Sequence, residues 1–226
     1  IKGSTSFPFF LLNLFYNNNM TKTFLHVGPG INYKDNTTDV FNTETWKEVR
    51  LDINEDVEPD ILASMTNLDI IDDNSYDAIY SAHNIEHVFP HEVDDVFNGF
   101  KRVLKDDGFL VLTCPDIKKV CKLIGEGNIT QKLYDSEAGP IYPLDVLYGL
   151  RRAILHGNEF MAHKHGFTSE SLLYYLKKAN FKSFCIAEAT DAYALWLIAY
   201  KGIMKEDSVL AAELKSHIAP RNQYEW

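Results

Sequence analysis

The sequence predicts an α/β fold in which helices cover both faces of one sheet. Short apolar runs, which are typical of buried strands, alternate with amphipathic segments of helical period through most of the chain. Two further apolar runs follow one another near its end and predict a terminal strand pair. In such a sheet, ligands bind beyond the carboxyl ends of the strands, near the point where the strand order switches.

Four strands are predicted in the first part of the chain. Residues 24–28 are apolar and run into Gly-Pro-Gly, and residues 48–52 end at Asp52. Residues 60–63 and 76–81 are the third and fourth candidates. The loops that follow these strands are therefore the first places to look for ligand contacts.

Two helices flank the fifth predicted strand, 109–113. Residues 90–105 carry an apolar face at helical spacing, formed by Val93, Val96, Phe97, Phe100, Val103 and Leu104. The Asp-Asp-Gly at 106–108 is expected to end that helix. A second helix is predicted from the N-cap Asp116 to Gly125. Its inward residues are expected to be Ile117, Val120, Cys121 and Ile124.

Residues 126–167 lack clean periodicity and predict an insertion after the fifth strand, which we interpret as an active-site lid with one helix in 144–155. A helix over 168–179 and strands over 181–187 and 192–200 close the fold. The predicted organisation is a leader or linker (1–21), one domain (22–203) and a C-terminal tail with a short helix (204–226).

Composition excludes several classes of protein. The 226 residues are 46% hydrophobic and 24% charged, which is typical of a globular domain and not of a disordered or collagenous chain. The net charge of -10 disfavours nucleic acid as a partner. Three cysteines without a Cys-x-x-Cys spacing favour reduced thiols and a cytoplasmic location. No run of about 18 apolar residues is present, so we expect no membrane span.

Two features together indicate a nucleoside-binding site. Gly28 and Gly30 follow the first strand, where glycine lets the backbone approach a ligand closely. Asp52 ends the next strand, about 22 residues later, where an acid can accept hydrogen bonds from both ribose hydroxyls. Each feature alone also fits a plain turn or a solvated acid.

Four motifs in order resemble class I S-adenosylmethionine-dependent methyltransferases. They are Leu-His-Val-Gly-Pro-Gly at 25–30, Arg-Leu-Asp-Ile at 50–53, the segment 73–87 and the segment 100–113. More narrowly, they resemble a branch of small bacterial predicted methyltransferases that open with Leu-His-x-Gly, as do segments 139–149 and 161–167. The resemblance covers roughly residues 22–200.

The resemblance implies a Rossmann-like sheet of seven strands whose last strand is antiparallel, with S-adenosylmethionine as cofactor. It implies that Gly28 and Gly30 contact the methionine and ribose, that Asp52 holds the ribose, and that 64–66 flank the adenine. The full set of implied cofactor residues is His26, Gly28, Pro29, Gly30, Asp52, Ile53, Ser64, Met65, Thr66, Ser81, Ala82 and His83. The sequence departs from the family pattern where His26 replaces an acid, Ser64 replaces an aspartate, and a third glycine is missing.

The histidines supply candidate bases. His83-Asn-Ile-Glu-His87 also matches an inverted zinc-protease pattern, but it follows a sheet strand without an evident downstream ligand, so we predict no metal site. His83 is the first candidate general base, and His163 or His165 in the insertion is the second. Packing at a strand–helix junction is the alternative for these rings. A metal site from the insertion histidines with Asp116 is a weaker alternative.

The sequence therefore predicts a methyltransferase that acts on a hydroxyl of a sugar, glycan or other small molecule. Aromatic residues in the insertion suit a sugar face. The apolar leader and the start at Ile1 would suit a domain fused to, or associated with, a glycosyltransferase. A non-catalytic methyltransferase-like binding domain and an NAD-dependent oxidoreductase remain as alternatives, and labelled cofactor would separate the three.

Overall fold

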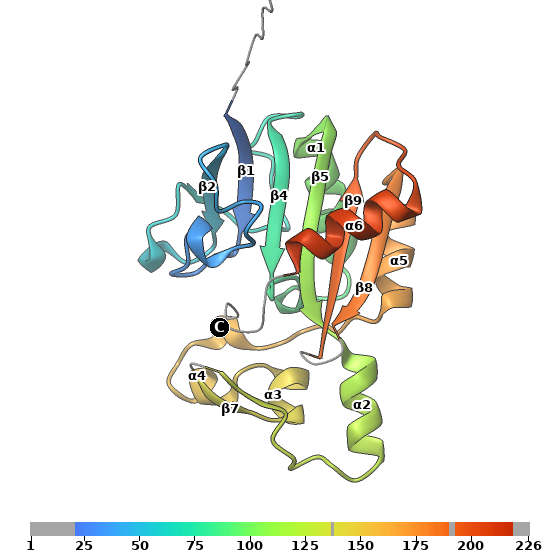
Figure 1. The fold of residues 1–226 in the computed structure, drawn as a ribbon. Helices are drawn as coiled ribbons and strands as arrows, with labels where there is room; N and C mark the ends of the chain where they lie inside the picture. The colour runs from blue at the N-terminus through green and yellow to red at the C-terminus, as the bar shows by residue number, and fades with distance from the viewer. Residues whose placement is uncertain (1–20, 137, 190–192, 219–226) are drawn as a thin grey trace, which may run out of the picture.

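The fold is built on one seven-stranded sheet in the order β3-β2-β1-β4-β5-β9-β8 (Figure 1). The structure is a computed structural model that describes residues 21–136, 138–189 and 193–218. The strands of the sheet are β1 (Lys22–Val27), β2 (Trp46–Asp52), β3 (Ile61–Leu62), β4 (Tyr76–Ala82), β5 (Leu104–Pro115), β8 (Ser183–Ala189) and β9 (Ala194–Tyr200).

Strand directions match the predicted topology. Strands β1 to β5 pair in parallel, whereas β9 runs antiparallel to both of its neighbours, β5 and β8. The predicted sheet with an antiparallel last strand is therefore confirmed. Because the chain winds outward from β1 to β3 and then returns to β4, the order switches between β1 and β4. Ligands are therefore expected at the loops after these two strands.

Helices cover both faces, as predicted. On one face, α1 (Val93–Val103) and α5 (Ser169–Lys178) pack side by side on the larger core cluster. On the other face, α6 (Asp207–His217) lies across the sheet in front of β5 and β9 (Figure 1). Phe41, from the segment between β1 and β2, completes this second core together with Trp196.

Two predicted boundaries are wrong in detail. The first helix ends at Val103, and Leu104 already has an extended backbone because it pairs with Tyr76 of β4. Strand β5 thus begins before the Asp-Asp-Gly that was expected to end the helix, and its pairing with β4 is irregular between Tyr76 and Ala78. The helix α2 (Ile117–Gly125) begins at the predicted N-cap, but Cys121 is exposed rather than inward.

The insertion forms a small layer of its own below the carboxyl ends of the strands (Figure 1). It contains the hairpin β6 (Tyr134–Ser136) and β7 (Gly139–Ile141), the helices α3 (Pro143–Tyr148) and α4 (Arg151–Leu155), and a 3₁₀ turn η4 (Glu159–Met161). The single helix expected here is split at Gly149, whose φ is 93°. A side chain there would collide with the carbonyl of Met161, so glycine is required.

The predicted leader lies outside the described residues except for Thr21. Helix α6 lies within the segment that was predicted as a tail, and its Leu210 and Leu214 are buried in the second core. Among the described helices, none combines the length and the apolar character needed to cross a membrane.

His217, at the end of α6, is expected to make stability depend on pH. Burial lowers the pKa of this ring to about 4, against an opposing effect of Glu213. The ring lies 3.0 Å from the Thr38 hydroxyl and contacts Phe41. In the unfolded chain the pKa returns to about 6.5, so the unfolded state binds more protons between these two values. The stability due to the neutral ring is complete above pH 6.5 and is lost as the pH falls toward 4.

Urea unfolding at several pH values would check this prediction. Over that range the loss from His217 alone is at most roughly 3 kcal/mol in the free energy of unfolding. As the pH falls, the free energy of unfolding should decrease less steeply in His217→Gln than in the parent. The two slopes should differ by up to about 1.4 kcal/mol per pH unit. Parallel curves for the parent and the variant would contradict it.

Candidate active site

The loop after β1 has the backbone needed to approach a ligand. Gly28 and Gly30 have φ values of 64° and 57°, a region that favours glycine. The Gly28 amide donates to the carbonyl of Leu51, which ties the loop to the end of β2. A side chain at Gly30 would meet no atom within 4 Å, so this side of the loop is open.

Asp52 holds the same loop from the end of β2. Its two carboxylate oxygens accept the backbone amides of Gly30 and Asn54, each at 2.9 Å. A carboxylate has about four lone-pair sites, so two remain for a ligand. The next residue, Ile53, is 55% exposed and offers an apolar surface beside this acid.

His26 lies below the loop and within the sheet. Its ring is 4% exposed, and Nδ1 lies 2.6 Å from a carboxylate oxygen of Glu48. The other Glu48 oxygen accepts a hydrogen bond from the backbone amide of Lys34. The His26–Glu48 pair therefore also holds the segment that follows the glycine loop. Burial is the main influence on the His26 ring and lowers its pKa. The geometry gives His26 a supporting role, and its predicted cofactor contact stays a prediction.

Three buried polar groups lie near the ends of β4 and β5. The hydroxyls of Ser81 and Thr113 and the amide nitrogen of Asn84 have no hydrogen-bond partner among the described residues. Strand pairing places Ser81 and Thr113 on opposite faces of the sheet, whereas the Asn84 side chain lies against Gly28. Because a buried polar group without a partner is costly, the Asn84 amide is well suited to meet a polar ligand beside this loop.

The segment predicted to flank the adenine is ordered by its own side chains. The hydroxyls of Ser64 and Thr66 lie 2.8 Å apart, and the Thr66 amide donates to Ser64. Met65 turns into the core. Pro29 is buried, while Ala82 is partly buried at the end of β4.

The turn after β4 brings the side chains of His83 and Glu86 together. His83 has a φ of 49°, and its amide donates to the carbonyl of Thr113 at the end of β5. The short 3₁₀ helix η3 (Ile85–His87) follows and buries Glu86, which is 1% exposed. Nδ1 of His83 lies 3.6 Å from Oε1 of Glu86.

The extended segment that ends the insertion is bound to this turn. The amides of Lys164 and His165 both donate to the Glu86 carbonyl, at 2.8 and 3.1 Å. The His87 ring bonds to the Ala162 carbonyl through Nδ1 at 3.1 Å. Nε2 of His163 lies 4.0 Å from Oε1 of Glu86. These contacts join two segments far apart in the sequence.

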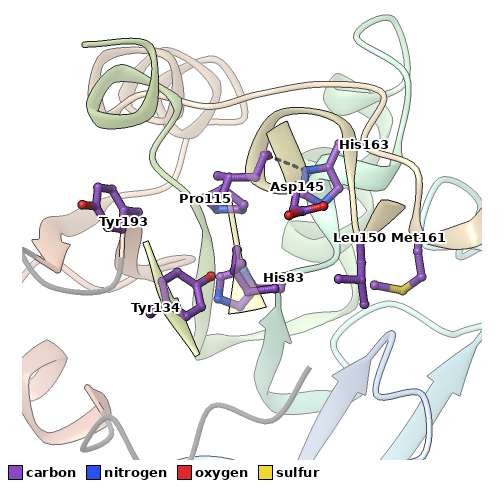
Figure 2. Close-up of a pocket in the computed structure, with 10 residues that line it drawn as sticks. His83, Pro115, Tyr134, Asp145, Leu150, Met161, His163 and Tyr193 are labelled. Carbon is purple, nitrogen blue, oxygen red and sulfur yellow. Dashed lines mark hydrogen bonds between the residues drawn. The ribbon is translucent and has the colours of Figure 1, made fainter. Parts of the chain in front are cut away.

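A cavity that opens to solvent lies between this turn and the insertion (Figure 2). It is lined by His83, Pro115, Tyr134, Ile141, Asp145, Val146, Leu150, Met161, His163 and Tyr193. Two of the three predicted bases, His83 and His163, therefore line the same cavity. The third, His165, is not among the lining residues and packs on the ring of Phe167.

Burial sets the protonation of the bases in this cavity. It lowers the pKa of His83 and of His163, although Glu86 opposes the shift in both rings. Both rings can therefore be neutral near pH 7 and accept a proton. Burial also raises the pKa of the Tyr134 hydroxyl, which stays protonated.

The sequence did not reveal several lining residues. Tyr134 and Tyr193 flank the cavity from a short hairpin and from the loop before β9, where no periodic pattern marks them. Asp145 accepts two hydrogen bonds from the Arg151 side chain, at 2.7 and 3.1 Å. The sequence shows that Asp145 and Arg151 are six residues apart. It does not show that the helix breaks at Gly149, which lets Arg151 turn back toward Asp145.

Comparisons with known proteins agree with this geometry. Residues 25–112, which run from β1 into β5, match a family described as methyltransferase domain. A possible exported protein from Bordetella parapertussis has a TM-score of 0.53 at 15% identity, covering 81% of this chain and 62% of that one. The chain thus spans less than two thirds of that protein. No curated protein matches the sequence.

Two archaeal structures share the fold over more of their length. A protein from Pyrococcus horikoshii has a TM-score of 0.52 at 15% identity, covering 81% of this chain and 84% of that one. A SAM-dependent methyltransferase from Archaeoglobus fulgidus has a TM-score of 0.51 at 14% identity, covering 80% and 86%. At these identities the similarity concerns the fold.

Proposed function

We propose that this chain, which its family match and its fold identify as a class I S-adenosylmethionine-dependent methyltransferase, methylates a hydroxyl group of a small molecule or sugar. The predicted family is confirmed at this coarse level. The assignment of a hydroxyl acceptor depends mainly on one observation. Two buried histidines line the same cavity at the carboxyl edge of the sheet.

The described residues fit the cofactor. The open side of Gly30 and the spare lone pairs of Asp52 suit a ribose, and Ile53 offers an apolar surface for a base. The unpartnered amide nitrogen of Asn84, which lies against Gly28, suits the polar amino-acid end. S-adenosylmethionine supplies a methyl group that is already activated by its sulfonium centre.

The chain's own part in the reaction is to position the acceptor and take its proton. A hydroxyl needs a base when it becomes a nucleophile, whereas an amine needs less help. His83 lines the cavity at the end of β4, on the side of the cofactor loop, so we assign it as the base. His163 faces the same cavity from the insertion and is the second choice. Because His165 packs away from the cavity, its role as a base is the weakest of the three.

The cavity suits a compact acceptor of mixed polarity. Tyr134 and Tyr193 supply aromatic surfaces, and Ile141, Val146 and Leu150 supply apolar ones. Aromatic rings bind the apolar face of sugars and planar molecules alike. The net charge of -10 gives no support for a nucleic acid acceptor. Fusion to, or association with, a glycosyltransferase is part of this proposal, as is a cytoplasmic location.

Calorimetric titration tests the cofactor. We expect S-adenosylmethionine and its demethylated product each to bind at one site per chain, and NAD to give no heat, because the loop lacks a third glycine. Heat with NAD alone would favour an oxidoreductase. Absence of heat with all three ligands, on protein with a cooperative thermal transition, would contradict the proposal.

A transfer assay with methyl-labelled cofactor then tests the acceptor. Sugars and oligosaccharides, small phenols and acids, and tRNA would be offered separately. Label in a sugar or a phenol is the expected result. Label only in tRNA, or only on an amine, would overturn the hydroxyl assignment. Cofactor binding without transfer to any class would favour a non-catalytic binding domain.

A further inference from the structure

One cluster joins His163, which lines the acceptor cavity, to two side chains that have no part in the proposed reaction. Glu86 and His87 come from the turn after β4, and His163 comes from the extended segment at the end of the insertion. One ligand atom from each lies within 4.8 Å of the other two. We propose that these three residues bind a divalent transition-metal ion such as zinc in the wall of the acceptor cavity.

The three ligand atoms lie slightly farther apart than they would around a bound zinc ion. Ligand atoms about 2.0–2.2 Å from zinc lie roughly 3.3–3.6 Å apart in a tetrahedral site. Oε1 of Glu86 and Nε2 of His163 are 4.0 Å apart, so a small rotation of either side chain brings them to that distance.

Both imidazoles are already held in the tautomer that binds a metal. Nδ1 of His163 lies 2.8 Å from the Val146 carbonyl, and Nδ1 of His87 lies 3.1 Å from the Ala162 carbonyl (the first of these is dashed in Figure 2). A carbonyl can only accept, so each Nδ1 carries the hydrogen and each Nε2 keeps its lone pair. Metal-binding histidines usually donate their other N–H in this way.

The carboxylate gives the second, independent indication. Glu86 is 1% exposed, and neither of its side-chain oxygens receives a hydrogen bond within the part of the chain that the structure describes. Its nearest ring nitrogens, at 3.6 and 4.0 Å, are beyond hydrogen-bond distance. A buried carboxylate without such bonds is costly, and a cation at the cluster would offset that cost.

The backbone keeps the cluster in place. Since Lys164 and His165 donate to the Glu86 carbonyl, the turn and the insertion are fixed together beside the ligand atoms. Two histidines and one carboxylate leave a coordination position open, as in catalytic zinc sites. Because His163 also lines the cavity, that position would face the acceptor.

An ion there would polarise the acceptor oxygen and ease the loss of its proton, a role that rests on the proposed function. Metal binding itself does not rest on it. The sequence shows no evident ligand downstream of the His-Asn-Ile-Glu-His pattern at 83–87, and it therefore predicts no metal site there. The structure brings that ligand from the insertion, and the set is Glu86, His87 and His163 rather than the zinc-protease pattern.

Zinc content and affinity provide the test. The full chain, without a histidine tag, would be stripped with a chelator, loaded with zinc, passed through a desalting column and analysed by mass spectrometry for metal. We expect about one zinc per chain. Competition with a chromophoric chelator should show at least about a 100-fold weaker affinity in Glu86→Gln and in His163→Gln. His91→Gln, at an exposed histidine outside the cluster, should retain the parent affinity.

Two outcomes would overturn the site. One is a parent chain that melts cooperatively yet retains only traces of zinc. The other is Glu86→Gln with unchanged zinc affinity, which would move the ion elsewhere. Calorimetry with S-adenosylmethionine on the stripped protein separates this failure from a failure of the proposed function, because the cofactor residues are not among the ligands.

Discussion

Replacing His83 with alanine is expected to lower the turnover number about 10²–10⁴-fold, the range for loss of a general base. The affinity for S-adenosylmethionine should stay close to that of the parent. The reason is position: the His83 ring lines the acceptor cavity, whereas the loop of Gly28 and Gly30 and the carboxylate of Asp52 are not among the lining residues. A loss of turnover without loss of cofactor binding would fit a residue that acts on the acceptor.

His91→Ala is the matched control, because His91 is an exposed histidine a few residues further on. Single-turnover rates and cofactor dissociation constants would be measured for both variants, together with their melting temperatures. If His83→Ala transfers methyl groups at the parent rate, His83 serves in packing at the turn and is not the base. A zinc content equal to the parent's would show that the lost rate does not come from a lost ion.

The fold was predictable because its signals are local. The glycines after β1, the acid that ends β2 and the N-caps Asp116 and Thr168 act within one turn of the chain. Each marks the end or the start of an element whose apolar period is clear. The order of such elements was enough to predict the layered α/β sheet and its closing strand pair, whereas the antiparallel last strand was implied by the resemblance to methyltransferases.

The second half of the site was not predictable, because it depends on contacts between distant segments. Nothing in the sequence near Glu86 indicates that His163 lies beside it, since the insertion that carries His163 has no regular period. The same holds for Tyr134 and Tyr193, which reach the cavity from two different loops. The His26–Glu48 pair is also a cross-strand contact, visible only once β1 and β2 are paired.

Changing Asp52 to alanine is expected to weaken the binding of S-adenosylmethionine by about 1–3 kcal/mol, roughly 5- to 150-fold in Kd. Two effects add. The variant would lose the charge-assisted hydrogen bonds that the spare lone pairs of the carboxylate can make with ribose hydroxyls. It would also lose the hydrogen bond that the carboxylate accepts from the Gly30 amide at 2.9 Å, so the loop beside the ligand would become less ordered.

Asp52→Asn separates the two effects, because an amide keeps one acceptor oxygen and no charge. Its affinity should lie between those of the parent and Asp52→Ala. Asp56→Ala, at an exposed acid in the next turn, should bind the cofactor like the parent. Calorimetry would supply the dissociation constants, and melting temperatures would show that each variant is folded. A folded Asp52→Ala with parent affinity would mean that the ribose is held by other residues, and that Asp52 serves the loop alone.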